Sequence, residues 1–434
     1  MADLVELKEI EERVILVAVS TEEESLAAAS LDELEELVET AGAVTVDKII
    51  QNRERIHPGT YLGKGKIEEV KERVWELNAT GIVCDDELSP AQLRNLEDAL
   101  DTKVMDRTMV ILDIFASRAT TREGKIQVEL AQLKYRAARL VGLRNSLSRL
   151  GGGIGTRGPG EKKLEVDRRL IHDRIGQLKA ELEDVKRHRD VARQQRTRNH
   201  TPVAAIVGYT NAGKSTLLNT LTDAGILAED KLFATLDPTT RNLELPGGEQ
   251  ILLTDTVGFI RKLPHNLIEA FKSTLEEAKY SDIILHVVDC SNPQMDMQMY
   301  VVYETLKDLG VHDKEVITVF NKIDAAGEMR IPRDLSSDYQ VKISAKTGEG
   351  LDELLNLLES ILRSRKVFLE RVYPYQDAGK IQLIRKYGQL LKEEYRDDGI
   401  FVSAYVPAEM YANLIKNGKK HKCTAAEHTG RIGG

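Results

Sequence analysis

A complete phosphate-binding loop pattern, G-x-x-x-x-G-K-[ST], is present at Gly208-Tyr-Thr-Asn-Ala-Gly213-Lys214-Ser215. An apolar run of strand type, 203–207, precedes it, and a segment with helical spacing, 216–221, follows it. In that context the glycines let successive backbone N–H groups face phosphate oxygens, and the helix N-terminus adds partial positive charge. We expect Lys214 to reach the β- and γ-phosphates and the Ser215 hydroxyl to hold Mg²⁺. The competing interpretation is an accidental glycine-rich turn, and the motifs downstream argue against it.

A second motif, Asn321-Lys322-Ile323-Asp324, predicts that the base is guanine. It follows the buried-strand run 315–320, so it falls at the carboxyl end of a strand, where open α/β sheets bind ligands. A buried Asp324 carboxylate can accept from guanine N1–H and the exocyclic amine, whereas adenine would leave it unpaired. We expect Asn321 to bond the purine edge and to tie this loop to the phosphate loop. The Lys322 stem can lie along the base face.

The segment Ser344-Ala345-Lys346 completes the expected base site. It follows a strand-type run, 339–343, and suits backbone donation to guanine O6. Each short motif alone could be a coincidence. In this order, behind a phosphate loop and at strand ends, they indicate GTP.

The γ-phosphate sensor is expected at Asp255-Thr256-Val257-Gly258, which ends the strand-type run 250–254. Asp255 would bind Mg²⁺ through water, and the Gly258 N–H would contact the γ-phosphate. The next residue is Phe259, where many GTPases carry a glutamine that orients the attacking water. Phenylalanine cannot do this, so we predict slow hydrolysis by the isolated chain, raised by a partner or by a monovalent cation. Asn211 could ligate K⁺ near the β- and γ-phosphates, or it could simply cap the loop.

A switch loop is expected at Phe233-Ala234-Thr235-Leu236-Asp237, which opens a polar stretch with a proline. Thr235 is the expected second Mg²⁺ hydroxyl, with Thr239 and Thr240 as alternatives. Loss of the γ-phosphate would release this loop and the segment after Asp255 together.

Composition places the chain among ordinary proteins of the cytoplasm. It has 434 residues, enough for about three domains. No apolar run approaches the roughly 20 residues of a membrane span, and the start of the chain lacks the pattern of a signal peptide. Cys84, Cys290 and Cys423 have neither zinc-site nor disulfide spacing. We expect a cytoplasmic monomer that does not insert in membranes. It should need no metal beyond Mg²⁺ and, if Asn211 acts as a ligand, K⁺.

Positive charge is concentrated in one segment. Residues 134–200 contain 18 Lys and Arg and 8 Asp and Glu, which gives this segment a net charge of +10. The whole chain has a net charge of −9, so the rest of the chain has a net charge of −19. A single basic segment on an acidic protein is typical of nucleic-acid contact. A solvated charged helix face explains the charge equally well.

The chain divides into four expected units. Residues 1–115 predict a small α/β domain that includes a helix at 30–39 with a capping box at Ser30 and Glu33, and another at 89–100 with Ser89 as N-cap. Residues 201–364 predict a P-loop GTPase domain with a mostly parallel sheet and a hairpin edge. Residues 365–434 predict a small C-terminal α/β appendage with a strand at 367–373, a helix at 379–396, a strand at 400–406 and a frayed end after Asn417.

Residues 116–200 predict an antiparallel helical hairpin. Apolar residues repeat at heptad spacing from Ile126 to Leu140 and again from Leu164 to Val185. The connection, 151–163, is a glycine-rich basic loop at the tip of this arm. Its G-x-G-x-x-G has no strand before it, so a dinucleotide site is excluded on context. Arg157, Lys162 and Lys163 are candidates for contact with rRNA, and a passive linker is the alternative.

Together these residues resemble the HflX family of ribosome-associated GTPases, within the Obg–HflX group of translational GTPases. The resemblance rests on 208–216, 233–237, 255–259 and, most specifically, on G-G-G-I-G-T-R-G-P-G-E-K-K-L-E-V-D-R-R at 151–169. It implies a GTPase that binds the 50S ribosomal subunit and splits stalled or idle 70S ribosomes, notably under heat stress. It also implies that the arm enters near the peptidyl transferase centre, and it supports Thr235 as the Mg²⁺ ligand.

The alternatives are a GTPase of tRNA modification or of ribosomal subunit assembly, and a membrane-associated switch. The first would need a catalytic group for base chemistry, and Cys423 lacks that context; no lipidation motif supports the switch. The expected partners are GTP, GDP, the 50S subunit and its rRNA, and no DNA. The residues expected at the nucleotide are Gly208, Tyr209, Thr210, Asn211, Ala212, Gly213, Lys214, Ser215, Thr216, Phe233, Ala234, Thr235, Leu236, Asp237, Asp255, Thr256, Val257, Gly258, Asn321, Lys322, Ile323, Asp324, Ser344, Ala345 and Lys346.

Overall fold

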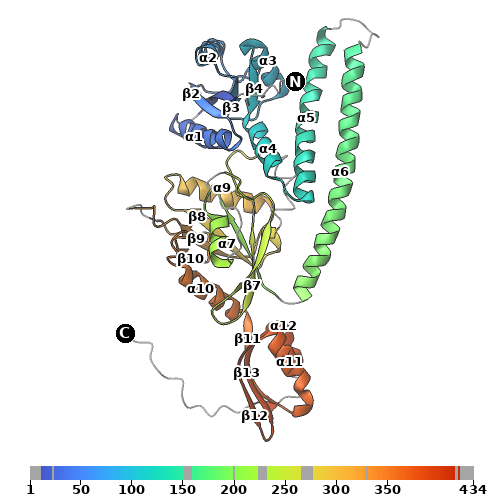
Figure 1. Cartoon of the computed structure of the whole chain (residues 1–434), viewed down its shortest axis with the longest axis vertical. Coiled ribbons are helices and arrows are strands. Elements are labelled where there is room, and N and C mark those ends of the chain that lie inside the picture. The colour runs from blue at the N-terminus through green and yellow to red at the C-terminus, as the bar shows by residue number, and fades with distance from the viewer. Residues whose placement is uncertain are drawn as a thin grey trace, which may run out of the picture.

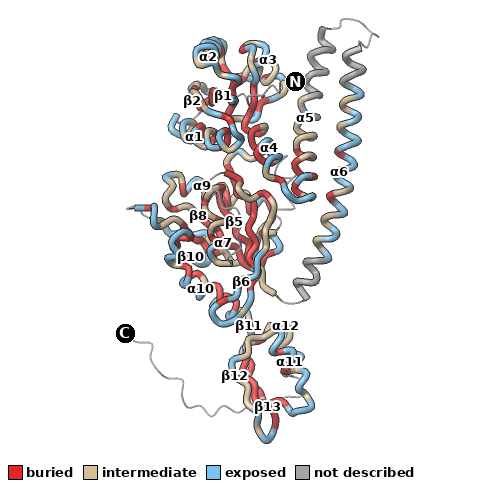
Figure 2. Tube along the Cα trace, in the orientation of Figure 1, coloured by how far each residue is buried: buried red, intermediate tan, exposed pale blue. Residues whose placement is uncertain are grey.

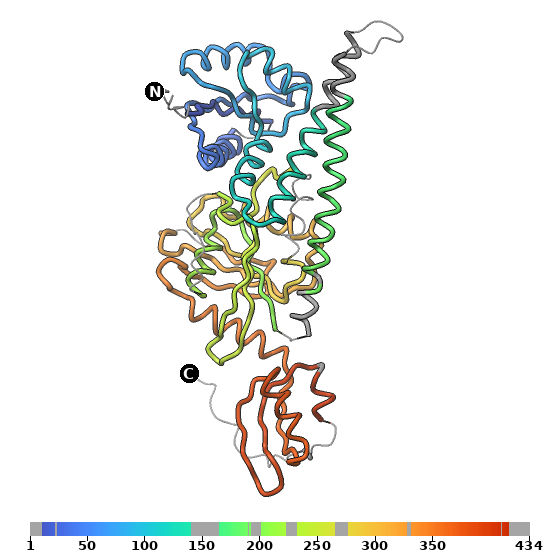
Figure 3. Tube along the Cα trace, turned by 45° about the vertical axis from the view of Figure 1, so that its right-hand side comes forward, coloured from blue at the N-terminus to red at the C-terminus, as the bar shows by residue number. Residues whose placement is uncertain are grey.

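The structure is a computed structural model of the 434-residue chain. It describes residues 11–21, 24–150, 159–198, 201–222, 232–264, 277–327, 331–415 and 419–420. An N-terminal α/β unit, a central α/β unit and a C-terminal unit follow one another along the long axis, with two long helices beside the first two (Figures 1 and 3). Buried residues concentrate in the sheets of all three units (Figure 2). This mixed α/β architecture with a helical hairpin confirms the predicted fold class.

A four-stranded parallel sheet, ordered β2-β1-β3-β4, forms the N-terminal unit. Its central strands β1 and β3 are apolar and buried, as expected for a parallel sheet with helices on both faces. The elements are β1 (Arg13–Ser20), α1 (Glu24–Thr40), β2 (Val44–Asn52), α2 (Lys64–Glu76), β3 (Gly81–Cys84), α3 (Pro90–Leu100), β4 (Lys103–Asp106) and α4 (Arg107–Arg118).

The two capping predictions for this unit have opposite outcomes. Helix α3 begins as predicted, with Ser89 as its N-cap and Pro90 at the first helical position. The capping box predicted at Ser30 and Glu33 is wrong, because α1 begins well before them. Ser30 lies inside the helix, where its buried hydroxyl donates to Asp85 at 2.7 Å instead of satisfying a helix end.

The predicted helical hairpin is present as α5 (Arg122–Leu150) and α6 (Pro159–Arg198), which lie side by side in Figures 1 and 3. Heptad positions of both helices form a separate apolar cluster between them. Its buried members are Ile126, Leu130, Ile175, Leu178 and Leu182, and Leu133, Ala137 and Ile171 are partly buried around them.

The tip of this arm differs from the prediction in one respect. Helix α6 already begins at Pro159, so Lys162 and Lys163 belong to the helix and not to the predicted loop 151–163. A proline at the first helical position is favourable, because its missing N–H has no helical partner there. Arg157 lies outside the described residues.

Helix α5 is anchored on the N-terminal unit near its middle. Asp106, fully buried at the start of α4, accepts from the Tyr135 hydroxyl at 2.5 Å and from the Arg139 guanidinium at 2.7 Å. The same carboxylate caps α4 by accepting from the Met109 N–H at 3.0 Å. The arm and the N-terminal sheet are therefore joined by charged hydrogen bonds as well as by packing.

A six-stranded sheet, ordered β10-β9-β8-β5-β7-β6, forms the central unit. Every neighbouring pair is parallel except β6 and β7, which form the predicted antiparallel hairpin at one edge. The elements are β5 (Val203–Gly208), α7 (Lys214–Thr222), β6 (Thr239–Glu244), β7 (Gln250–Asp255), β8 (Ile283–Asp289), α9 (Met295–Asp308), β9 (Glu315–Asn321), β10 (Tyr339–Lys342) and α10 (Leu351–Ser364). The carboxyl ends of the parallel strands meet at one edge, where this class of sheet binds ligands.

The C-terminal unit is an antiparallel sheet ordered β12-β13-β11-β14. Its elements are β11 (Lys366–Tyr373), α11 (Ala378–Tyr387), β12 (Gln389–Arg396), β13 (Gly399–Pro407), α12 (Ala408–Leu414) and β14 (Lys419–Lys420). The helix predicted at 379–396 is wrong in its second half, because the chain leaves the helix at Gly388 and returns as β12. A Cβ at position 388 would lie 2.8 Å from the Tyr405 carbonyl oxygen, so only glycine fits that crossing.

The end of the chain also departs from the prediction. Residues 419–420, expected to fray, pair with Arg371 and Val372 on β11. The remainder of that predicted tail lies outside the described residues. Of the helices that the structure describes, none has the length and apolar character needed to cross a membrane.

Candidate functional site

The phosphate loop forms the wall of a pocket at the carboxyl end of β5. The loop leaves β5 at Gly208 and enters α7 at Lys214, which is the strand–loop–helix context that the sequence predicts. Gly213 adopts a φ of +91°, and a Cβ there would lie 2.3 Å from the Asn321 amide nitrogen, so glycine is needed on both counts. The pocket is lined by Thr210, Asn211, Gly213, Lys214, Ser215, Thr216, Phe233, Ala234, Thr235, Thr256 and Gly258.

Lys214 is the buried cation of this pocket. Its side chain is almost fully buried, and its Nζ donates to the Tyr209 carbonyl oxygen at 2.7 Å. Burial lowers the pKa of Lys214 to about 8, although the nearby Asp255 carboxylate opposes this shift. An anion that enters the pocket would favour the charged ammonium, so the site is electrostatically suited to phosphate.

Three oxygen groups meet beside Lys214. The Ser215 hydroxyl lies 2.8 Å from the Thr235 hydroxyl and donates to Asp255 Oδ2 at 2.8 Å. Asp255 is fully buried, its Oδ1 has no hydrogen-bond partner, and burial raises the pKa of its carboxyl despite the neighbouring ammonium. A buried carboxylate with an unpartnered oxygen next to two hydroxyls fits a hard divalent cation such as Mg²⁺. The alternatives for Thr235 lie elsewhere, since Thr239 and Thr240 are on β6 and the latter bonds the Thr254 hydroxyl at 3.0 Å.

The segment after β7 is joined to the phosphate loop through the backbone. The Thr210 N–H donates to the Phe259 carbonyl oxygen at 2.7 Å, and the Phe259 N–H donates to the Gly208 carbonyl oxygen at 3.1 Å. A Cβ at Gly258 would lie 2.8 Å from Thr210 Cα and 3.0 Å from Lys214 Nζ. Glycine at 258 therefore allows this segment to approach the phosphate loop closely.

Asn321 ties its loop to the phosphate loop, as predicted, and it also joins the two base-site motifs. Its amide donates to the Ala212 carbonyl oxygen at 2.9 Å, and its Oδ1 accepts from the Ala345 N–H at 2.9 Å. One buried side chain thus connects the phosphate loop with the segment after β10. Lys322 is held by Asp289, with 2.7 Å between Nζ and Oδ2. Thr220 of α7 also donates to the Ala345 carbonyl oxygen at 2.8 Å.

The expected burial of Asp324 is wrong, because its side chain is exposed at the end of the β9 loop. The strand ends only shortly before it, so the backbone carries the residue out of the sheet. Its carboxylate is accessible to a base edge from solvent. The residues of the two base motifs adjoin the pocket but do not line it, and Lys346 is exposed.

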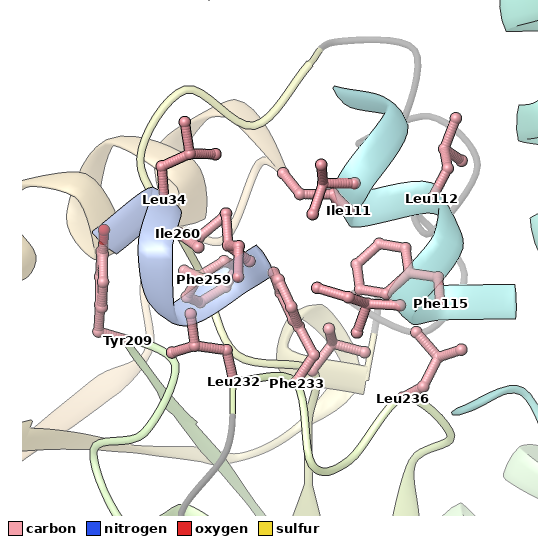
Figure 4. Packing of buried hydrophobic residues seen from close by; sticks show 14 of the residues in the cluster. Leu34, Ile111, Leu112, Phe115, Tyr209, Leu232, Phe233, Leu236, Phe259 and Ile260 are labelled. Atoms are coloured by element: carbon pink, nitrogen blue, oxygen red, sulfur yellow. The ribbon is translucent and has the colours of Figure 1, made fainter. Parts of the chain in front are cut away.

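Phe233 and Leu236, both expected at the nucleotide, also pack toward the N-terminal unit, together with Phe259. Figure 4 shows Phe233, Leu236 and Phe259 in one apolar cluster with Ile111 and Phe115 of α4, and all five are buried. The rings of Phe115 and Phe233 meet edge to face, with centroids 4.7 Å apart. We call this cluster the interdomain seam. Phe259 is therefore occupied in packing, which agrees with its inability to orient water.

Polar contacts continue the seam. Tyr209, in the phosphate loop, donates its hydroxyl to Glu33 of α1 and accepts from the Arg261 N–H at 2.9 Å. Burial raises the pKa of Tyr209 to about 12, so the hydroxyl stays protonated. Lys262, four residues after Gly258, pairs with Asp85 at 2.5 Å and Asp86 at 2.7 Å. Sequence reasoning missed these contacts, since nothing local to either unit marks the partner in the other.

The fold and the pocket together define a P-loop GTPase. Family comparisons assign three consecutive matches: a GTP-binding GTPase N-terminal region at 28–116, a GTP-binding GTPase middle region at 118–196 and a 50S ribosome-binding GTPase at 203–322.

Curated relatives identify the family. The chain is 84% identical over 417 residues to the GTPase HflX of Lacrimispora saccharolytica, which covers 96% of this chain and 99% of that protein. It is 44% identical over 390 residues to the GTPase HflX of Escherichia coli, which covers 89% and 92% respectively. The chain therefore belongs to the HflX family of GTPases, and it is a GTP-hydrolysing enzyme. Among solved structures it is similar to a GTP-binding protein from the archaeon Sulfolobus solfataricus in complex with GDP, with 25% identity, coverage of 80% and 98%, and a TM-score of 0.42.

Proposed function

We propose that the pocket binds Mg²⁺–GTP, and that the nucleotide state controls binding to the 50S ribosomal subunit and the splitting of 70S ribosomes, particularly under stress. The observation that carries this proposal is the interdomain seam. Both nucleotide-sensing segments pack against the N-terminal unit, so a change at the γ-phosphate must also change contacts with that unit. We further propose that the protein acts in the cytoplasm as a monomer and binds rRNA and no DNA.

In this proposal each part of the pocket has one task. Lys214 and the backbone N–H groups of the phosphate loop hold the β- and γ-phosphates. Ser215 and Thr235 bind Mg²⁺ directly, and Asp255 binds it through water. The metal would neutralise charge on the phosphate oxygens and help to orient GTP for attack by water. Asp324, with Ser344-Ala345-Lys346, selects guanine.

Support for the ribosome as partner comes from the arm. The basic segment 134–200 lies almost entirely on α5 and α6 and their connection. Helices rich in Lys and Arg on an acidic protein favour contact with a polyanion. The match of the central unit to a family of 50S ribosome-binding GTPases points to rRNA as that polyanion.

Replacing Arg157, Lys162 and Lys163 by alanine is expected to spare GTP binding and impair ribosome splitting by about tenfold or more, because phosphate contacts dominate such binding. The measurement is sucrose-gradient sedimentation of 70S ribosomes with the full chain and a non-hydrolysable GTP analogue. Wild type should reduce the 70S peak and co-migrate with 50S subunits. Lys307, Lys314 and Lys392, changed together to alanine, provide a control with equal loss of charge away from the arm.

Two results would contradict this proposal. If wild type leaves the 70S peak unchanged and does not migrate with 50S subunits, the ribosomal function is wrong. If the arm variant splits ribosomes as well as wild type does, the function can stand but the role of these three residues is wrong.

Hydrolysis by the isolated chain is expected to be slow and to rise severalfold or more when K⁺ replaces Na⁺. Phe259 is buried in the seam and cannot orient water, so added positive charge near the β- and γ-phosphates should lower the barrier. Asn211 lines the pocket in a left-handed conformation, with φ of +60°, and is the proposed K⁺ ligand. Steady-state GTP turnover in matched KCl and NaCl buffers tests this, with Asn211→Ala as the variant that should lose the difference. Equal rates in both salts would exclude the cation.

A further inference from the structure

Asp237 does not face the pocket, although it ends the switch loop. Its carboxylate accepts four hydrogen bonds from two residues just before α5. The donors are the Thr120 N–H at 3.0 Å, the Thr120 hydroxyl at 2.7 Å, the Thr121 N–H at 2.9 Å and the Thr121 hydroxyl at 2.5 Å. Every oxygen of the side chain is thus used to hold the start of the arm.

The start of α5 has a cap and a glycine that leave room for this carboxylate. Thr121 also caps α5, since its hydroxyl accepts from the Gly124 N–H at 2.9 Å. A Cβ at Gly124 would lie 2.4 Å from Asp237 Oδ1, so the absence of a side chain there allows the approach. Burial would raise the pKa of Asp237, yet the hydrogen bonds from Thr121 and Thr120 outweigh it and leave the pKa lowered.

Thr235, whose hydroxyl faces Ser215, lies two residues before Asp237. The two are separated by Leu236, which is buried in the seam, and Phe233 on the other side is buried there too. Phe233 also donates its N–H to the Thr210 hydroxyl of the phosphate loop at 3.0 Å. With anchors on both sides, the Thr235 hydroxyl is placed 2.8 Å from Ser215 Oγ.

We infer that Asp237 is a positioning residue for Mg²⁺ binding: by fixing the switch loop to the start of α5, it presents Thr235 to the metal. The inference rests on the proposed role of Thr235 as a Mg²⁺ ligand. The same contact links the start of the arm to the proposed metal site through the switch loop. Since Thr120 and Thr121 belong to the arm side of the contact, a displacement of α5 moves Thr235, and coupling of this kind is reciprocal. Binding of Mg²⁺–GTP therefore favours the arm position seen here, and a ribosome that shifts the arm weakens metal binding.

The test is a Mg²⁺ titration of fluorescent GTP-analogue binding to the full chain, compared with binding in EDTA. In Asp237→Asn one carboxylate oxygen becomes an N–H₂ group, which cannot accept from the donors of Thr120 and Thr121. The Mg²⁺ concentration for half-maximal binding should rise about 10–100-fold, the usual effect of losing a group that orients a metal ligand. Binding in EDTA should stay unchanged, which a general loss of structure would not allow. Asp308→Asn, an exposed site on α9, is the matched control and should behave as wild type.

Thr120→Val removes one hydroxyl from outside the central unit without a change of charge. It should raise the Mg²⁺ concentration for half-maximal binding by a smaller factor than Asp237→Asn does. In the double variant Thr120→Val/Asp237→Asn, the increase should be smaller than the product of the two single increases. If Asp237→Asn proves unfolded by thermal denaturation, Thr120→Val carries the test alone.

Unchanged Mg²⁺ curves in the folded variants would overturn the inference and leave the proposed function intact. Shifts that multiply independently would also overturn it, because the two residues would then act separately. A wild-type chain that binds no GTP with Mg²⁺ would overturn the proposed function and this inference together.

Discussion

Replacing Lys214 by alanine is expected to lower GTP turnover by about 10²–10³-fold, the cost of removing one preorganised donor aimed at the reacting phosphate. Lys214 is almost fully buried and lies beside Asp255, so its loss would leave an uncompensated carboxylate in the phosphate site. Binding of the triphosphate should weaken more than binding of the nucleoside, because only the phosphates contact this residue.

The measurements are steady-state turnover and calorimetric titration with GTP, GDP and guanosine. Lys307→Ala is the matched control, since this lysine is exposed on α9 in the same unit and pairs with the surface residue Glu304 at 3.4 Å. It should bind and turn over GTP as wild type does. Turnover by Lys214→Ala within a factor of a few of wild type would contradict the assignment of this pocket as the phosphate site.

Asp324→Asn is expected to weaken GTP binding by about 100-fold or more. The carboxylate can accept from two guanine donors, and hydrogen bonds to a charged group contribute about 1.5–3 kcal/mol each. An asparagine replaces one acceptor with an N–H₂ donor, which opposes the guanine amine. The same donor suits the C2 carbonyl of xanthine, so binding of xanthosine triphosphate should improve in the variant.

Competition titrations against a fluorescent GTP analogue measure both effects. Asp313→Asn, an exposed position before β9 in the same unit, is the control and should leave both affinities unchanged. If Asp324→Asn binds GTP and xanthosine triphosphate with the same preference as wild type, another residue selects the base.

The phosphate loop, the strand-end motifs and the arm were predictable because each depends on local pattern. Gly213 must be glycine wherever the loop wraps a phosphate, and the heptad residues of α5 and α6 specify their own partner. The link through Asn321 could be anticipated in part, since parallel strands end at the same edge of the sheet, although β8 lies between β9 and β5.

The errors have physical causes of a different kind. The sequence after Gly388 contains helix-forming residues, but Arg385 of α11 pairs with Glu393 of β12 at 2.6 Å, and β12 completes a sheet whose other strands are distant in sequence. Ser30 resembles an N-cap, yet Asp85 of a neighbouring strand end takes its hydroxyl. Tertiary partners override local preference in both cases.

The contacts between units could not be predicted at all. Asp237 and Thr121 are far apart in the chain, and no local sequence pattern around either residue predicts their contact. The sequence marks Phe259 only as the absence of the glutamine that orients water in many GTPases. In the structure Phe259 has a packing role, because its side chain is buried in the interdomain seam between the nucleotide site and the N-terminal unit.

Calorimetry of the full chain with GTP and with ATP, in Mg²⁺ buffer, tests the guanine-selective triphosphate pocket most directly. We predict saturable binding of GTP and at least about 100-fold weaker binding of ATP, because adenine lacks both donors that Asp324 needs. Equal affinity for the two nucleotides, a preference for ATP, or no binding of either would contradict it.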